Sequence, residues 1–261
     1  MLGSEGFFLV LLSVVYWSIH KTLGFWGLVV MPLSIFLTSE VPKDIIKLPR
    51  PDVRGVTVPT YTFPSGHTSG AVSVWGYLSV MIKTRWIWVC SLTIIMLVGA
   101  SRVLLGYHFP GDVLGGIVTG SIFLVLFFTV GYRLAARYQK KHFSFALLLF
   151  LAVAIPLGLS LLPATFAPNL MGYLAGAAVG YLLERKTLNF DIRGSWQQHL
   201  IRALVGLLVI LIIIPGLNLL IPPYMHLLTF LQYAFSTFWT TYLAPLTFIK
   251  TGFARNFSTP E

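Results

Sequence analysis

The sequence predicts an all-α protein, a polytopic membrane helix bundle with about nine transmembrane helices. The first observation behind this prediction is composition. Of the 261 residues, 56% are hydrophobic and 10% are charged, whereas soluble domains carry about 25% charged residues. The second is a mean hydropathy of +0.83. The third is that long apolar stretches recur along the whole chain, as they do in proteins that cross a bilayer several times.

The apolar stretches define the expected helices. A membrane-spanning helix needs about 20 largely apolar residues, and the stretches approach that length. They cover residues 6–19, 23–42, 67–82, 86–104, 112–131, 143–162, 168–183, 200–222 and 225–247. The first is short for a span, and the seventh is short and rich in glycine. The chain therefore has room for several spans and for little else.

Two glycine patterns predict close helix packing. Gly172, Gly176 and Gly180 recur every fourth residue in the seventh segment, and Gly116 and Gly120 form a shorter version in the fifth. Residues spaced by four lie on one face of a helix, where small side chains let two helix backbones approach. We interpret both patterns as packing surfaces.

The positions of the basic residues predict the orientation of the bundle. If the loop from Lys43 to Ser65 faces outside, 13 of the 18 basic residues fall on the cytoplasmic side, as the positive-inside rule requires. The others are Lys43, Lys47, Arg50, Arg54 and Arg102. Cations on the disfavoured side need another reason to be there, so we interpret this group as functional. The sequence thus predicts a multi-pass cell-membrane protein with its amino terminus outside, its carboxyl terminus in the cytoplasm and its active site on the extracytoplasmic face.

The net charge of +10 does not indicate a nucleic-acid partner, because the basic residues form short clusters between apolar stretches rather than one stripe. The single cysteine, Cys90, excludes an intrachain disulfide framework and a multi-cysteine metal site. Nothing in the pattern specifies the oligomeric state. The expected partners are therefore membrane lipids and the substrate.

The first polar motif is KDIIKLPRP, residues 43–51, at the outer end of the second expected helix. Lys43 supplies a mobile point charge and Arg50 a planar fork, and this combination suits the several oxygens of a phosphate group. Taken alone, such residues could equally contact lipid headgroups at the membrane surface. Lys47, Asp52 and Arg54 are neighbouring candidates for headgroup selection.

The second motif is Pro64, Ser65, Gly66 and His67, directly before the third apolar segment. Ser65 is expected to cap that helix, and Gly66 leaves its backbone N–H accessible. A helix amino terminus with free N–H groups is an anion site. His67, within one turn of a bound anion, is in a position to donate a proton to a leaving oxygen.

The third motif is SRVLLGYHFPGD, residues 101–112. Gly106 to Gly111 interrupt the helical pattern, and Asp112 opens the next helix. Asp112 is near enough to His108 to hold one imidazole nitrogen and leave the other free as a nucleophile. The alternative for this motif alone is a helix-capping aspartate beside an interfacial histidine. Tyr107 is placed to line the same pocket.

The three motifs fall on the same predicted face of the membrane. In order and spacing they resemble the type 2 phosphatidic acid phosphatase superfamily, which is related to glucose-6-phosphatase and the vanadium haloperoxidases and has the signature K-x6-RP, PSGH and SR-x5-H-x3-D. Every fixed position is present, in Lys43, Arg50, Pro51, Pro64, Ser65, Gly66, His67, Ser101, Arg102, His108 and Asp112.

The resemblance implies an acid-phosphatase/haloperoxidase-like helical core. Residues 1–135 would form the catalytic transmembrane core, and residues 136–261 would add transmembrane helices of unknown role. His108 would attack phosphorus to form a phosphohistidine, Asp112 would orient it, and His67 would protonate the leaving oxygen and then activate water. The phosphate would be bound by Lys43, Arg50, Ser65, Gly66 and Arg102. The resemblance implies no metal ion and no cofactor.

The expected substrate is a lipid phosphate of the undecaprenyl diphosphate, phosphatidic acid, phosphatidylglycerol phosphate or sphingoid phosphate type. The motif sequence KDIIKLPRP is similar to the corresponding motif of sphingosine-phosphate and dolichyl-diphosphate phosphatases. The helix count and outward amino terminus are instead similar to the glucose-6-phosphatase branch, so a soluble sugar phosphate such as glucose 6-phosphate is the alternative substrate. Phosphotransfer between lipids would use the same residues.

A non-catalytic membrane transporter or scaffold with the same fold is the alternative from another functional class. Two features weigh against it. All the motif positions are intact, and the second half of the chain is expected to hold no buried acidic or basic residue of the kind that lines a translocation path.

Overall fold

The computed structural model describes residues 2–51, 61–134, 143–161, 167–222 and 224–256. Within them the chain is helical almost throughout, with one short pair of strands. The helices are α1 (Glu5–Ser18), α2 (Lys21–Ile35), η1 (Phe36–Glu40), α3 (Val41–Ile46), α4 (Gly66–Ile82), α5 (Arg85–Leu104), α6 (Pro110–Leu126), η2 (Phe127–Gly131), α8 (Phe145–Ser160), α9 (Pro168–Thr187), α10 (Trp196–Leu220), α11 (His226–Phe238), η3 (Trp239–Leu243) and α12 (Ala244–Lys250). Strand β1 (Phe190–Asp191) pairs antiparallel with β2 (Arg255–Asn256). The all-α prediction is confirmed.

Each expected segment coincides with a continuous helix to within a few residues. The segments η1, η2 and η3 are π-helical turns inside longer helices, so α2 runs on into α3 and α11 runs on into α12. Among the described residues, four helices are long and apolar enough to cross a membrane by themselves: Lys21–Ile46, Arg85–Leu104, Pro110–Leu134 and Trp196–Leu220. The prediction of a membrane helix bundle is therefore confirmed.

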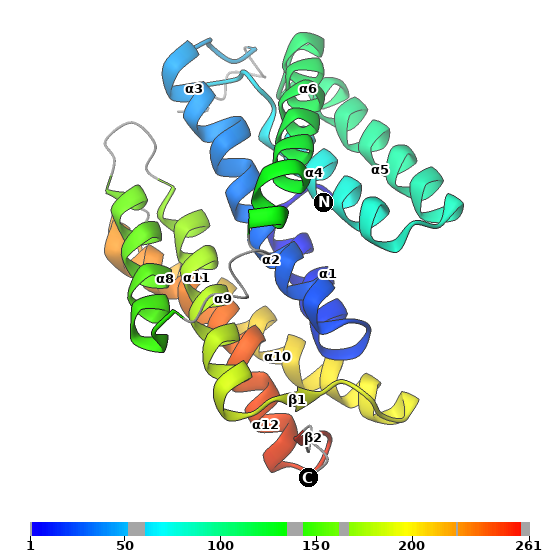
Figure 1. Cartoon of the computed structure of the whole chain (residues 1–261). Coiled ribbons are helices and arrows are strands. Elements are labelled where there is room, and N and C mark those ends of the chain that lie inside the picture. Colours follow the sequence, from blue (N-terminus) through cyan, green and yellow to red (C-terminus); the bar gives the residue numbers. More distant parts are fainter. Residues whose placement is uncertain (1, 52–60, 135–142, 162–166, 223, 257–261) are drawn as a thin grey trace. The chain divides into compact units, whose positions relative to one another are not determined.

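The chain folds as two compact units (Figure 1). Unit 1 comprises Met1–Phe8, Val30–Phe143 and Pro163–Thr165, and unit 2 comprises Leu9–Val29, Ser144–Leu162 and Phe166–Glu261. Helices α1 and α2 each contribute residues to both units. All three sequence motifs belong to unit 1. The division of roles at residue 135 stays a prediction.

Unit 1 is organised around α4, which packs against α5 and, most extensively, against α6 (Figure 1). A Cβ on Gly116 would lie 2.8 Å from the carbonyl oxygen of Ser65, and one on Gly120 would lie 2.9 Å from that of Ser69. Any larger side chain would push the two helices apart. The packing interpretation of this glycine pair is confirmed, and its consequence is that the first turns of α4 and α6 are held side by side.

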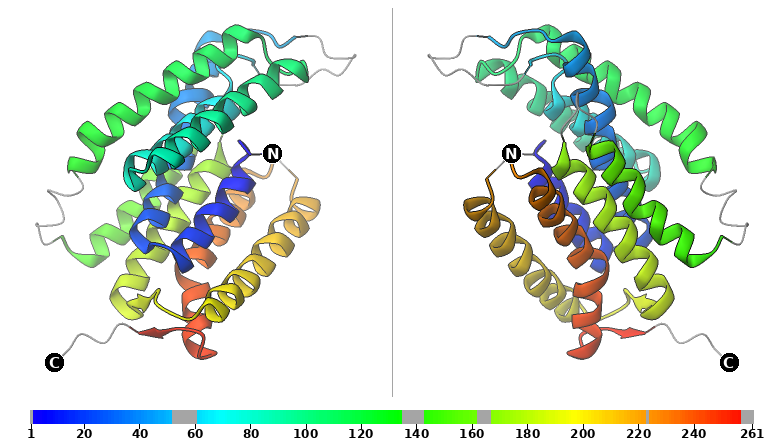
Figure 2. Two further views of the ribbon diagram at one scale, coloured as in Figure 1. Left: turned by 90° about the vertical axis from the view of Figure 1, so that its right-hand side faces the viewer. Right: turned by 90° about the vertical axis from the view of Figure 1, so that its left-hand side faces the viewer.

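Unit 2 is organised around the contact of α9 with α11, which can be followed in Figure 2 by their yellow-green and orange colours. A Cβ on Gly172, Gly176 or Gly180 would overlap atoms of Phe230, Ala234 or Thr241 on the neighbouring helix. The packing interpretation of this longer pattern is confirmed as well. Hydroxyl groups complete the interface, because Thr237 Oγ1 donates to the carbonyl oxygen of Tyr173 at 2.8 Å.

The second half is expected to hold no buried charge of the kind that lines a translocation path, but it does hold two buried charged residues. Glu184 and Arg202 are both fully buried in unit 2. Lys21 Nζ lies 2.6 Å from Glu184 Oε1, and the guanidinium of Arg202 donates to the carbonyl oxygens of Phe253, Ile192 and Arg193. Nothing in the sequence indicated this burial, because Lys21 and Phe253, which contact Glu184 and Arg202, are distant from them in sequence. Both residues lie near helix ends and are tied to the β1–β2 region, so they do not mark a path along a span.

Candidate active site

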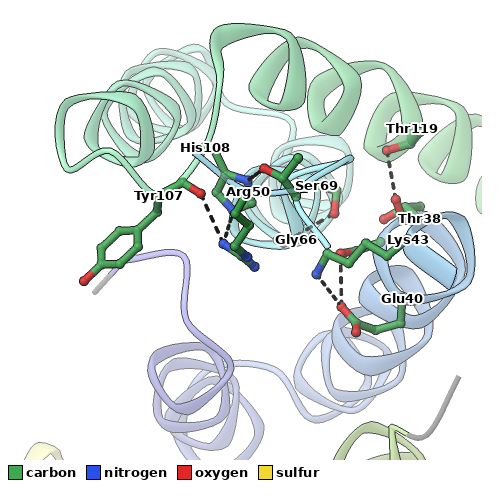
Figure 3. A network of polar contacts seen from close by, with 11 residues as sticks. Thr38, Glu40, Lys43, Arg50, Gly66, Ser69, Tyr107, His108 and Thr119 are labelled. Atoms are coloured by element: carbon green, nitrogen blue, oxygen red, sulfur yellow. Dashed lines mark hydrogen bonds and ion pairs between the residues drawn. The ribbon is translucent and has the colours of Figure 1, made fainter. Parts of the chain in front are cut away.

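The first motif is positioned by the π-helical turn η1 and by α3. Lys43 Nζ lies 2.8 Å from Glu40 Oε1, and the Ser39 hydroxyl donates to the same oxygen at 3.1 Å (Figure 3). A Cβ on Gly66 would lie 2.7 Å from Ser39 Oγ and 3.7 Å from Lys43 Nζ. Gly66 therefore allows the amino terminus of α4 to lie directly beside the lysine ammonium. π-Helical turns inside α-helices are frequent at functional sites, and this one sets the position of Glu40.

Arg50, in the first motif, contacts residues of the third motif. Helix α3 ends at Ile46, and the next residue, Lys47, has a φ of 56° that turns the chain out of the helix. The Arg50 guanidinium then reaches across unit 1, where Nη1 donates to the carbonyl oxygen of Tyr107 at 3.2 Å and lies 3.5 Å from His108 Nε2 (Figure 3). The side chain that the sequence assigned to phosphate binding thus stands beside the predicted nucleophile.

The turn after α5 returns His108 to the end of that helix. Gly106 has a φ of 76°, a left-handed conformation that favours glycine. The backbone N–H groups of Tyr107 and His108 then donate to the carbonyl oxygen of Arg102, at 3.0 and 3.3 Å. His108 is 4% exposed as a result. The Arg102 guanidinium lies 5.9 Å from the Tyr107 ring centroid, and its Nε donates to Ser101 Oγ.

The second motif occupies the first turn of α4. Ser65 is at the N-cap position as expected, but its hydroxyl accepts no backbone N–H of that turn, so the capping role predicted for its side chain is wrong. Instead, Thr68 Oγ1 donates to Ser65 Oγ at 3.1 Å, and the Ser65 N–H donates to the Asp112 carbonyl oxygen at 3.0 Å. The N–H groups of the first turn are left uncapped by Ser65, which suits an anion site. His67 is exposed at this turn.

His108 and Asp112 are joined through a residue that the sequence did not single out. Thr62 Oγ1 lies 3.1 Å from His108 Nδ1 and donates a short hydrogen bond to Asp112 Oδ2. The direct separation between His108 Nδ1 and Asp112 Oδ2 is 3.4 Å. Asp112 Oδ2 also accepts the Phe109 N–H at 2.7 Å, at the start of α6. Thr62 lies outside the fixed signature positions, so no spacing rule could have identified it.

The partners of His108 define its tautomer. A guanidinium has donors and no acceptor, so the nitrogen that faces Arg50, Nε2, must present its lone pair. Nδ1 then carries the proton. Burial, followed by the positive charge of Arg50, lowers the pKa of His108 to about 4, although Asp112 opposes the shift. At neutral pH the ring is therefore uncharged, with a free lone pair on Nε2.

The structure brings most of the predicted site residues together within unit 1. Lys43 lies beside Gly66, in the first turn of α4 that also carries His67, and Arg50 lies beside His108. Ser101 instead donates to the Val98 carbonyl oxygen inside α5. The predicted neighbours Asp52 and Arg54 lie outside the described residues, and Lys47 is exposed at the end of α3. Across the part of the chain that the structure describes, no group of three or more His, Cys, Asp or Glu side chains could hold a metal ion.

An arrangement of several cations, a helix amino terminus and an uncharged histidine is suited to a phosphate ester. Residues 23–136 of the chain match the PAP2 superfamily, and residues 168–256 match the PAP2 superfamily phosphatase, transmembrane extension. The chain belongs to the PAP2 superfamily. The match to the core family contains all three motifs, and the match to the extension runs from α9 to β2.

Curated relatives in this superfamily are lipid phosphatases by name. The chain is 32% identical to phosphatidylglycerophosphatase B of Bacillus subtilis over 143 residues, which cover 49% of this chain and 68% of the relative. It is 29% identical to sphingosine-1-phosphate phosphatase 2 of Mus musculus over 137 residues, which cover 48% and 38% of the two chains. It is 37% identical to undecaprenyl-diphosphatase BcrC of Bacillus subtilis over 67 residues, which cover 26% and 34%.

These alignments cover between about one third and two thirds of each relative's length. No solved structure matches the chain significantly. Family membership and the relatives support a membrane phosphatase that acts on lipid phosphates in general. The relatives act on different headgroups by name, so the substrate of this chain has to be argued from its own site.

Proposed function

We propose that this protein is an integral membrane phosphatase that hydrolyses a phosphomonoester or diphosphate of a lipid through a phosphohistidine intermediate. The observation that carries the proposal is the environment of His108. Its Nε2 lone pair faces the Arg50 guanidinium, while Nδ1 is held on the side of Thr62 and Asp112. A buried, uncharged imidazole with one nitrogen tethered and the other facing a cation is arranged as a nucleophile for an anionic group.

The proposed first step transfers the phosphoryl group to the enzyme. The Nε2 lone pair of His108 forms a bond to phosphorus while the bond from phosphorus to the lipid oxygen breaks. The negative charge of the bound phosphate favours the protonated form of His67, which donates its proton to that oxygen. The oxygen leaves as the lipid alcohol, or as a lipid monophosphate when the substrate is a diphosphate. Charge on the phosphoryl oxygens is stabilised by Lys43, Arg50, Ser65, Gly66 and Arg102.

The proposed second step returns the enzyme to its starting state. His67, now neutral, takes a proton from water, and the water oxygen attacks phosphorus. The N–P bond breaks, its electron pair returns to His108 Nε2, and inorganic phosphate leaves. Throughout, the Asp112 carboxylate balances positive charge on the imidazole. The mechanism relies on protein cations for electrostatic stabilisation and needs no metal ion.

An apolar cavity favours a lipid substrate over a soluble one. The cavity has a volume of about 280 Å³ and lies between α5 and α6, lined among others by Val103, Pro110 and Val113. Val103 and Pro110 flank the turn that carries His108. An acyl or prenyl chain in this cavity would keep its phosphate within reach of the turn. A sugar phosphate would leave these apolar walls without a partner.

The distribution of charge supports an active site on the extracytoplasmic face. The site gathers Lys43, Arg50 and Arg102, which are three of the five cations that depart from the positive-inside rule. A requirement to bind phosphate supplies the reason for their position. The proposed topology has the amino terminus outside and the carboxyl terminus in the cytoplasm.

The test is phosphate release by the detergent-purified full chain from a panel of lipid phosphates and glucose 6-phosphate, with EDTA present. We expect release from at least one lipid phosphate, loss of release in His108→Ala, and normal release in His199→Ala, a matched change in unit 2. Release from glucose 6-phosphate alone would assign the soluble substrate. No release from any compound by folded protein would favour the transporter or scaffold alternative.

A further inference from the structure

Thr62 occupies the space between the predicted nucleophile and its carboxylate. Its Oγ1 lies 3.1 Å from His108 Nδ1, closer than the 3.4 Å that separates Nδ1 from Asp112 Oδ2. The residue is 1% exposed, so water does not compete for these bonds. The contact of His108 Nδ1 with Asp112 Oδ2 is therefore longer than its contact with Thr62 Oγ1.

The directions of the hydrogen bonds around Thr62 follow from its partners. The Asp112 carboxylate accepts hydrogen bonds and cannot donate when ionised, so the single hydroxyl proton of Thr62 points to Oδ2. The Thr62 oxygen can then only accept from His108 Nδ1. On the far side of the ring, Arg50 can only donate to Nε2. Both ends of the imidazole thus favour the same tautomer.

We propose that Thr62 is a positioning residue that forms a His108–Thr62–Asp112 relay and holds His108 in the tautomer with the proton on Nδ1 and the lone pair on Nε2. In this relay the carboxylate acts on the imidazole through the hydroxyl. When Nε2 bonds to phosphorus, positive charge develops on the ring, and the Nδ1–H to Thr62 hydrogen bond becomes stronger. The proposal rests on the proposed function for its catalytic consequence but not for the tautomer itself.

The backbone of Thr62 is fixed independently of its hydroxyl. Its N–H donates to the Leu48 carbonyl oxygen at 2.9 Å, two residues before Arg50. Thr62 thereby connects the segment that carries Arg50 with the turn that carries His108. Removal of the hydroxyl alone should leave this connection intact, which allows the relay to be tested without loss of the surrounding structure.

The kinetic test compares Thr62→Val with Thr62→Ser and Thr119→Val. Valine keeps the shape and removes the hydroxyl, so we expect kcat to fall by about ten- to a hundredfold, the usual cost of losing a residue that orients a reactive group, with KM changed little. Serine should restore most of the rate. Thr119 is the matched control, because its hydroxyl also makes a part-buried contact in unit 1, to the Thr38 carbonyl oxygen at 3.2 Å, away from His108 (Figure 3).

The tautomer is measured directly by ¹⁵N NMR of the histidine-labelled protein at neutral pH, with the His108 signals assigned by their loss in His108→Ala. We expect a protonated Nδ1 and an unprotonated Nε2 in the wild type. In Thr62→Val we expect a measurably larger Nε2–H population, because only the longer contacts with Arg50 and Asp112 then favour the wild-type tautomer. If Thr62→Val does not fold, Thr62→Cys, with a much weaker acceptor, replaces it and should shift the population in the same direction.

Two results would overturn the relay. One is an unchanged tautomer in Thr62→Val, and the other is a loss of kcat no larger than in Thr119→Val. Failure of the proposed function is distinguishable, because a wild type that releases phosphate from no substrate would leave the NMR comparison intact. In that case the tautomer shift still supports the relay, and its absence still refutes it.

Discussion

Each unit contains a lysine paired with a glutamate, and the two pairs serve different purposes. In unit 2, Lys21 Nζ lies 2.6 Å from Glu184 Oε1, and the glutamate side chain is 0% exposed. The same carboxylate accepts the Phe190 N–H. In unit 1, Lys43 Nζ lies 2.8 Å from Glu40 Oε1, but that glutamate is 33% exposed and the ammonium stands beside the amino terminus of α4.

The difference shows how polar groups are used in the two units. In unit 2 the buried charges contact protein groups, as Glu184 Oε1 contacts Lys21 and Arg202 contacts backbone carbonyl oxygens. In unit 1, Arg50 lies beside His108, and Lys43 lies beside the first turn of α4, whose N–H groups Ser65 leaves uncapped. Loss of one partner of the buried pair would leave an unpaired buried charge, whereas the more exposed pair can exchange its glutamate for a phosphate.

The largest expected contrast is between Lys43→Met and Lys21→Met. The first should lower kcat/KM for the lipid phosphate by about a hundredfold with little loss of stability, because it removes a charge that stabilises the transition state. The second should leave Glu184 buried and unpaired and cost about 3–5 kcal/mol of stability, with kcat/KM per folded molecule unchanged. Turnover and thermal unfolding in the same detergent measure both. If Lys43→Met and Lys21→Met changed kcat/KM and stability equally, the two ion pairs would not differ in their roles.

A smaller effect is expected from Gly176→Val. A Cβ at this position would overlap the Ala234 carbonyl, so α9 and α11 must separate, at a cost of about 1–3 kcal/mol. Gly158→Val in α8 is the matched control, since a Cβ there meets nothing within 4 Å. Thermal unfolding and the rate per folded molecule are to be compared. A lower rate in Gly176→Val at full stability would mean that unit 2 contributes to catalysis and would contradict its assignment to packing.

The smallest expected effect is a shift in pH dependence. The pKa of His108 is lowered to about 4, so the lone pair on Nε2 is present above that pH and lost as pH falls through it. The positive charge of Arg50 contributes to this lowering, and Arg50→Gln should therefore raise the pKa and move the acid limb of kcat to higher pH. Lys83→Gln, an exposed cation distant in sequence, should leave the limb in place. If the acid limb does not move in Arg50→Gln, the charge of Arg50 does not contribute to the lowered pKa of His108.

The sequence by itself determined the helices and the signature residues of this protein. Apolar stretches of bilayer length place helices without knowledge of their neighbours, because the hydrocarbon region selects for them residue by residue. The glycine patterns were also interpretable from sequence, since residues four apart share a helix face. The chemistry of the three motifs followed from fixed spacing, and with it the family.

Only the tertiary structure decided which groups each motif residue contacts. Thr62 is 46 residues from His108 and 50 from Asp112, so its role depends on how α4, α6 and the preceding loop pack. Ser101 and Ser65 belong to the signature, yet their hydroxyls contact protein groups. The buried charge of Glu184 became tolerable only when the fold brought Lys21 beside it. A hydrogen bond requires atoms to meet within about 3 Å, and no local pattern encodes which distant segments will meet.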